Sequence, residues 1–273
     1  MHWRILMLRI GLVLKVAIAS AMICTVSSAQ LVDRTDQSRD PDPRAVNLTL
    51  ERRGDIYMAR KMYREAGETY TEAILMEPDS AKLVNKLGIS YHQLLMLDDA
   101  RKQYQRAWKI DKTYGQALNN LGTVYHAKGK YRQAVRTYRQ ALKISPYSAS
   151  IYSNLGTSQF ARRRFKDASA AYLKALELDP NVFEVKGNFG TMLQERSVGN
   201  RGKYYYFMAK AYAGVEMWER AILYLRKALE EGYGNARKLA GESAFEAMHE
   251  LPGFQRLAFP ETIASAADNA TTN

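Results

Sequence analysis

Residues 115–148 read GQALNNLGTVYHAKGKYRQAVRTYRQALKISPYS, and the pattern of this stretch recurs along the chain every 34 residues. Small residues and tyrosines keep the same spacing from copy to copy. They are Gly54, Gly88, Gly122, Gly156 and Gly190, with Ala66, Ala100, Ala134 and Ala168, and Tyr70, Tyr104, Tyr138, Tyr172 and Tyr206. Several independent series with one period indicate a repeat architecture.

Each copy predicts an antiparallel pair of helices. In residues 117–126 the apolar side chains fall on one helical face, and residues 131–144 form a second amphipathic run. Gly129 separates the two runs and can take a positive φ at a helix end. Pro146 cannot continue the second helix. A single pair cannot bury its apolar face, so we expect the copies to stack on one another.

The residues that define the copy are Leu118, Leu121, Gly122, Tyr125, Ala134, Tyr138, Ala141 and Pro146. This pattern resembles the tetratricopeptide repeat, and residues 47–182 fit it as four copies. The departures are Arg53 for a leucine, Lys112 for a proline, and Phe160 one place late. The resemblance implies an all-α fold, a right-handed α-α superhelix (solenoid) of tetratricopeptide-type helix pairs. Members of that family mostly bind peptides or proteins in a superhelical groove.

Residues 1–29 have the three-part layout of a secretory signal peptide. A basic start is followed by an apolar stretch, and the small residues of 27–29 precede Gln30. Two alternatives remain open: an uncleaved membrane anchor formed by residues 5–26, and a lipid attached at Cys24. Lys15 makes a spanning helix costly, and Ile23 is not the small residue that lipid attachment requires. We therefore predict export, to a periplasm or to the outside.

The rest of the chain divides around the repeats. Residues 30–46 are polar and contain two prolines, which predicts a flexible linker. After residue 182 the register shifts, since Ala221 follows Ala168 by 53 residues, or 34 plus 19. We interpret 183–201 as an insert or degenerate helix and 202–235 as the last repeat; the alternative is a fifth copy followed by an extra helix. A helical cap is expected at 236–259 and a disordered tail at 260–273.

The sequence lacks the patterns of an enzyme. Cys24 is the only cysteine and lies in the expected signal peptide, so the mature chain would carry no disulfide and no thiol chemistry. We find no spacing of a nucleophile and a base, no phosphate-binding loop and no cluster of metal ligands. We therefore predict no enzymatic activity, no cofactor and no metal.

The resemblance also implies which residues line the groove, because certain places of each first helix point inward in tetratricopeptide superhelices. In this sequence those residues are Lys82, Asn85, Lys86, His92, Gln116, Asn119, Asn120, Thr123, His126, Asn154, Thr157 and Phe160. Asparagine offers a donor and an acceptor together, which suits the backbone of an extended peptide. The histidines and Phe160 suggest a mixed aromatic and apolar stripe. The alternative is a polar face that is simply solvated.

The whole chain has a net charge of +12. Much of this charge lies on the second helices and on turns, which predicts a basic outer face. The residues are Arg101, Lys102, Arg106, Lys109, Arg132, Arg136, Arg139, Arg162, Arg163, Arg164 and Lys166. This favours, as an alternative function, binding of an anionic polymer or a membrane surface through the convex face. Export argues against a nucleic-acid partner, and a solvated surface remains the plainer interpretation.

Overall fold

The computed structural model describes residues 43–184 and 200–260 of the 273, with side chains from residue 49 onward. The chain divides into two units, Met1–Val46 and Asn47–Asn273. The expected signal peptide, residues 30–42 of the linker, residues 185–199 of the insert and residues 261–273 of the tail lie outside the described residues. No helix in the described ranges is long and apolar enough to cross a membrane.

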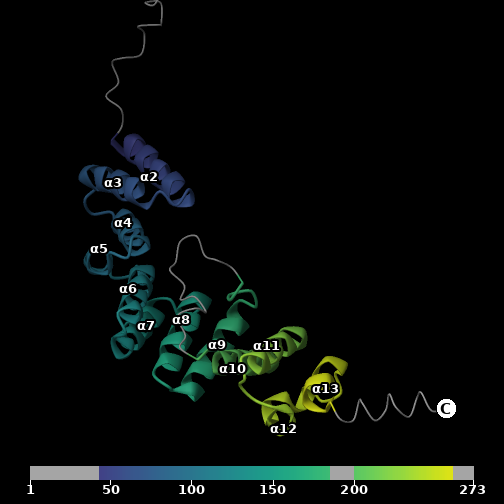
Figure 1. Cartoon of the computed structure of the whole chain (residues 1–273). Helices are drawn as coiled ribbons and strands as arrows, with labels where there is room; N and C mark the ends of the chain where they lie inside the picture. The colour runs from purple at the N-terminus through teal and green to yellow at the C-terminus, as the bar shows by residue number, and fades with distance from the viewer. Residues whose placement is uncertain (1–42, 185–199, 261–273) are drawn as a thin grey trace, which may run out of the picture. The chain divides into compact units, whose positions relative to one another are not determined.

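Helices follow one another in pairs, and each pair corresponds to one copy of the repeat (Figure 1). The first four pairs are α2 (Pro43–Ala59) with α3 (Tyr63–Met76), α4 (Ala81–Gln93) with α5 (Leu97–Ile110), α6 (Gly115–Ala127) with α7 (Tyr131–Ile144), and α8 (Ala149–Ala161) with α9 (Phe165–Leu178). The next pair is α10 (Arg201–Gly214) with α11 (Trp218–Glu230). Three short helices follow: α12 (Ala236–Ala240), the 3-10 helix η2 (Ser243–Met248) and α13 (Pro252–Ala258).

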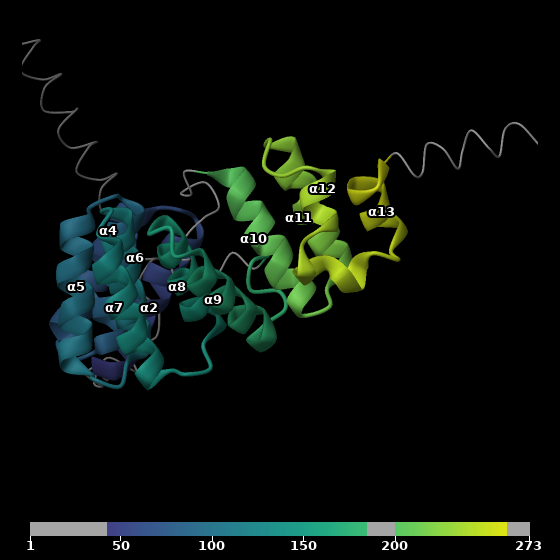
Figure 2. The same ribbon diagram turned by 90° about the horizontal axis from the view of Figure 1, so that it is seen from below.

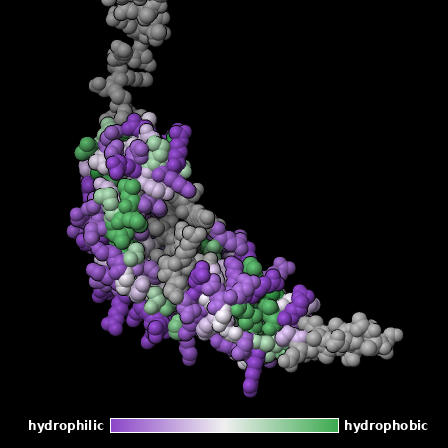
Figure 3. Space-filling view, in the orientation of Figure 1, coloured by the Kyte–Doolittle hydropathy of each residue, from purple (hydrophilic) through white to green (hydrophobic). Residues whose placement is uncertain are grey.

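Neighbouring helices from α3 to α11 pack on one another in chain order, and α10 packs on α9 although the described chain is interrupted between them (Figure 2). The described ranges contain no strand. The predicted fold class, an all-α superhelix of stacked helix pairs, is confirmed. The face drawn in Figure 3 is mostly hydrophilic, with apolar surface over the region of α4 and near α11 and α13.

Helix α2 begins at Pro43, so residues 43–46 are helical and do not belong to the flexible linker that we expected to run to 46. Proline suits the first position of a helix, because its φ is already helical and its missing N–H has no partner to lose there. The amino end of the first repeat is therefore longer than its sequence pattern indicates.

The repeated glycine and tyrosine are in contact within each of the first four pairs. Tyr70, Tyr104, Tyr138 and Tyr172 are almost completely buried. Each ring lies where a side chain at the glycine of the preceding helix would be, for example Tyr104 against Gly88. In the α10–α11 pair the corresponding residues are Ala209 and Leu225, both fully buried. A smaller side chain on the second helix therefore accompanies a larger one on the first.

The turn between the two helices of each pair contains one residue in the left-handed backbone conformation. The sequence indicates this conformation only in the third repeat, where the residue is a glycine. Gly129 has a φ of 69°, and the non-glycine residues Lys61, Leu95, Arg163 and Glu216 have φ between 58° and 61°. These five residues occupy the same place in their pairs. The fold thus imposes a left-handed residue at this place whichever side chain stands there.

The three short C-terminal helices pack on the α10–α11 pair. Phe245, Met248 and Phe254 are fully buried, and the Phe245 ring centre lies 5.7 Å from that of Tyr206 on α10. The hydrophobic core therefore continues from the repeats into these helices.

Candidate functional site

Buried asparagine pairs join the first helices of neighbouring repeats. Asn120 Nδ2 donates to Asn85 Oδ1 at 3.0 Å, which links α6 to α4. Asn154 Nδ2 donates to Asn119 Oδ1 at 3.0 Å, which links α8 to α6. In both pairs the acceptor is in the fifth place of one copy and the donor is in the sixth place of the next. Four of the predicted groove residues, Asn85, Asn119, Asn120 and Asn154, thus form one polar row along the stack, which we call the amide row.

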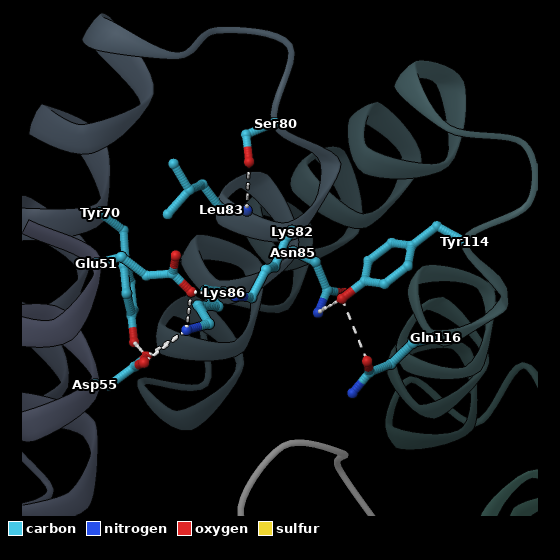
Figure 4. Close-up of polar contacts among 10 residues, drawn as sticks. All are labelled: Glu51, Asp55, Tyr70, Ser80, Lys82, Leu83, Asn85, Lys86, Tyr114 and Gln116. Carbon is cyan, nitrogen blue, oxygen red and sulfur yellow. Dashed lines mark hydrogen bonds and ion pairs between the residues drawn. The ribbon is translucent and has the colours of Figure 1, made fainter. Parts of the chain in front are cut away.

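At its amino end the row continues into a cluster of charged side chains (Figure 4). Lys86 Nζ lies 2.5 Å from Glu51 Oε1 and 2.6 Å from Asp55 Oδ1, and the Lys86 side chain is only 8% exposed. Tyr70 donates its hydroxyl to Asp55 at 2.7 Å. Lys86 is therefore held inside the structure by two carboxylates of α2.

Lys82 completes this cluster from the solvent side. Its Nζ lies 2.7 Å from Glu51 Oε1, and its side chain is 63% exposed. Burial of Glu51 opposes its ionisation, but the ammonium groups of Lys82 and Lys86 outweigh this effect and hold the pKa of Glu51 below its ordinary value. Glu51 is thus ionised at neutral pH, and Lys82 is the most accessible member of the cluster.

Beside the first asparagine pair, a tyrosine and a glutamine extend the polar surface (Figure 4). Asn85 Nδ2 lies 3.5 Å from the Tyr114 hydroxyl, and that hydroxyl donates to Gln116 Oε1 at 3.2 Å. Tyr114 is the last residue of the second copy and was not among the predicted groove residues. Its place in the repeat is not one of those expected to point into the groove, so only the tertiary structure shows that Tyr114 belongs to this polar surface.

The two histidines occupy equivalent places but differ in their partners. His126 Nδ1 lies 2.9 Å from Ser158 Oγ of the next repeat. The residue equivalent to Ser158 one copy earlier is Val124, so His92 Nδ1 has no hydrogen-bond partner among the described residues. Burial lowers the pKa of both histidines to about 4, so both are neutral at pH 7. No group of three or more His, Cys, Asp or Glu side chains in the described ranges could hold a metal ion.

Phe160 lies in the core and not in a binding stripe. Its ring centre is 5.2 Å from that of Phe165, 5.8 Å from that of Tyr204 and 6.2 Å from that of Phe207. The expectation that Phe160 forms an aromatic stripe with the histidines is therefore wrong. The α10 helix, whose position relative to α8 does not follow from the repeat pattern, covers the ring.

The threonines of the predicted groove are also engaged within the protein. Thr123 donates to the carbonyl of Asn120 at 2.7 Å, and Thr157 donates to the carbonyl of Ser153 at 3.1 Å. Tyr172 donates to Thr157 Oγ1 at 3.3 Å. Of the asparagine oxygens in the row, Asn120 Oδ1 is buried and accepts no hydrogen bond from any described residue.

Three protein-family models match parts of this chain. The model described as "TPR repeat" matches residues 122–162, and two models described as "Tetratricopeptide repeat" match residues 49–80 and 149–182. This chain is a tetratricopeptide-repeat protein. The amide row therefore runs along the first helices of tetratricopeptide repeats. A search of curated proteins found no match.

Several solved structures are similar to this chain at low sequence identity. PilF of Pseudomonas aeruginosa is 18% identical, with a TM-score of 0.52, and the match covers 84% of this chain and 99% of PilF. MamA from Desulfovibrio magneticus is 17% identical, with a TM-score of 0.48 and coverage of 70% and 96%. The first repeat domain of Spaghetti (RPAP3), bound to an HSP90 peptide, is 22% identical, with a TM-score of 0.42 and coverage of 43% and 95%.

Proposed function

We propose that this chain is a non-enzymatic, exported scaffold that binds an extended peptide, or a segment of a partner protein, along the amide row. Tetratricopeptide-repeat folds generally serve as interaction scaffolds. The amide row, which is buried, and the exposed Lys82 place hydrogen-bonding groups and charge along one series of helices, which suits a ligand that runs from repeat to repeat. Recognition would rest on the ligand's backbone, since the amides do not select a particular side chain.

Asn120 Oδ1 is the observation that carries this proposal. A buried acceptor without a donor costs about 1–3 kcal/mol, and native proteins rarely keep one without a reason. The nitrogen of the same amide is committed to Asn85. The oxygen therefore has unused capacity to accept a backbone N–H at the middle of the row, and because Asn120 is fully buried, a peptide would have to displace the groups that cover it.

The chain offers a matched pair of variants to test this role. Asn120→Ala and Asn85→Ala both remove the Asn120–Asn85 hydrogen bond, but only Asn120→Ala removes the free acceptor. A peptide selected on the full chain from a random display library would be labelled, and its Kd measured by fluorescence anisotropy. We expect Asn120→Ala to weaken binding about tenfold, the effect of one hydrogen bond to a buried group. Asn85→Ala should weaken it much less.

Thermal unfolding of both variants controls for structural damage. Both variants lose the same inter-repeat bond, and Asn85→Ala also loses the 3.5 Å contact to Tyr114, so its melting temperature should fall by at least as much as that of Asn120→Ala. Equal losses of affinity would mean that binding depends only on the integrity of the α4–α6 contact. Unchanged affinity in both variants would place the peptide elsewhere on the protein.

Export is the second part of the proposal and rests on the layout of residues 1–29. N-terminal sequencing of the protein recovered from producing cells should find a start at or near Gln30. Recovery of an intact amino terminus in the membrane fraction would favour an anchor formed by residues 5–26. Covalent lipid at Cys24 would identify a lipoprotein.

A further inference from the structure

The turns between the first and second helices of repeats one to four form a surface distinct from the amide row. We call it the turn edge. It consists of Arg60–Met62, Leu94–Met96, Lys128–Lys130 and Arg162–Arg164. Its residues read RKM, LLM, KGK and RRR, so it combines seven cations and four large apolar side chains with no acidic residue. Neither the repeat pattern nor the hydrophobic core accounts for this composition.

Contacts between repeats show that the last three of these turns adjoin one another. Lys128 Nζ lies 2.7 Å from Asp98 Oδ1, at the start of the helix that follows the second turn. The third and fourth turns share an open depression of about 780 Å³, which is lined by residues 129–133 with Arg162 and Arg164. The turn edge is therefore continuous from repeat two to repeat four.

The positive charge at this depression is largely uncompensated. Within the described ranges, no acidic side chain forms an ion pair with Lys130, Arg132 or Arg162, whereas Arg164 pairs with Asp167 at 3.2 Å. The α7 helix, which begins beside the depression, contains no acidic residue at all. The depression thus suits a phosphate group or another compact anion.

The second turn carries apolar side chains into solvent. Leu95 is 80% exposed, Met96 is 43% exposed and Leu94 is 36% exposed, and Met62 of the first turn is also 36% exposed. Leu95 moreover holds the left-handed conformation that glycine provides at the equivalent place in repeat three. Three consecutive exposed apolar residues, one of them in a strained conformation, oppose solubility and local stability unless something covers them.

We propose that the turn edge docks on an anionic lipid bilayer. The cations of the third and fourth turns would contact lipid phosphates, with one headgroup phosphate in the depression. Residues 94–96 would enter the boundary between headgroups and acyl chains. Basic residues beside exposed leucine and methionine are the combination that such an interface favours. An acidic protein would satisfy the cations, but it would not require the apolar turn between them.

The opposite edge of the repeats does not have this character. The turns after α3, α5 and α9 contain acidic residues, namely Glu77, Asp79, Asp111 and Asp179, whereas the turn after α7 contains none. The turn edge contains no acidic residue and so differs in charge from this edge, although Leu75, Met76 and Tyr147 are exposed apolar side chains here too. This edge also supplies the matched control sites, since Lys109 and Lys143 are exposed cations at the carboxyl ends of α5 and α7.

A local fluorescent label tests the proposal in the full chain. In a Cys24→Ser background, an environment-sensitive dye would be attached either at Leu95→Cys or at Lys109→Cys. Each protein would be titrated with phosphatidylcholine vesicles, with and without phosphatidylglycerol. We expect a blue shift for the label at 95 with anionic vesicles only, reduced by salt. The label at 109 should not respond, which also separates docking from any tethering by residues 1–42.

Charge variants give the second measurement. Each lysine or arginine near an anionic surface contributes a factor of about five to partitioning. Lys130→Gln with Arg162→Gln should therefore weaken vesicle binding about 30-fold, whereas Lys109→Gln with Lys143→Gln should leave it nearly unchanged. Equal responses of the two labels, equal binding to neutral vesicles, or equal effects of the two double variants would overturn the proposal. So would a response to polyglutamate without a response to vesicles, which would indicate an acidic protein instead.

Discussion

Gly122 and Tyr138 share one space between α6 and α7. An ideal Cβ built on Gly122 would lie 2.7 Å from both Cδ1 and Cζ of the Tyr138 ring. Real Cβ atoms do not approach carbon this closely, and Tyr138 is fully buried, so the ring cannot move aside cheaply. The glycine in the middle of the helix costs about 1 kcal/mol relative to alanine, and the packing of the tyrosine offsets this cost.

Gly122→Ala should therefore destabilise the protein by about 2–3 kcal/mol, because the added methyl overpacks a closed core. Tyr138→Leu should partly rescue it, since the α10–α11 pair already combines Ala209 with Leu225 at these places. Urea unfolding of the two single variants and of the double variant measures their coupling. Additive effects would show that the two residues do not compete for the same space.

Lys86→Met should cost about 3 kcal/mol, because it removes the buried cation between the carboxylates of Glu51 and Asp55 and leaves only the exposed Lys82 beside Glu51. Lys82→Met removes a partner of the same Glu51 from an exposed position and should cost less than about 1 kcal/mol. Both variants remove one positive charge beside Glu51, so the difference between their free energies of unfolding in urea measures the effect of burial. Similar losses would mean that Lys86 is no better shielded from water than Lys82.

Acidification should weaken the fold between pH 6.5 and pH 4 through His92 and His126. Their folded pKa is about 4, against an ordinary value of 6.5, so the unfolded chain binds more protons in this window. The free energy of unfolding should fall with decreasing pH, by about 2 kcal/mol per histidine between pH 7 and pH 5. A His92→Gln/His126→Gln variant should show a flatter profile of urea midpoint against pH. An unchanged slope would assign the effect to other groups.

Arg163→Gly should stabilise the protein by about 0.5–1 kcal/mol, because the left-handed backbone costs more for arginine than the extra freedom of glycine costs in the unfolded chain. The mirror variant is Gly129→Ala, at a φ of 69° with no atom within 4 Å of the added Cβ. It should lose about 1 kcal/mol from backbone conformation alone. Thermal unfolding of both variants is the measurement, and opposite signs are the expected outcome.

Much of the candidate site could be named from the sequence, but its chemistry could not. The place of each residue in a copy identified Asn85, Asn119, Asn120 and Asn154. It did not show that an asparagine in the fifth place pairs with one in the sixth place of the next copy. The same rule named His92 and His126 as equivalents, although only His126 faces a serine. A period states which positions are equivalent, whereas a hydrogen bond depends on what the neighbouring repeat supplies.

The sequence by itself determined that this protein is a stack of helix pairs with a period of 34 residues, because glycine, alanine and tyrosine recur wherever two helices must approach closely. Only the tertiary structure decided which polar side chains are used inside the stack and which keep free hydrogen-bonding capacity. It also decided that Phe160 is covered by α10 and that the basic and apolar turns adjoin one another. The helices form from local contacts within one copy, but these relationships arise between copies, where residues more than 30 positions apart meet.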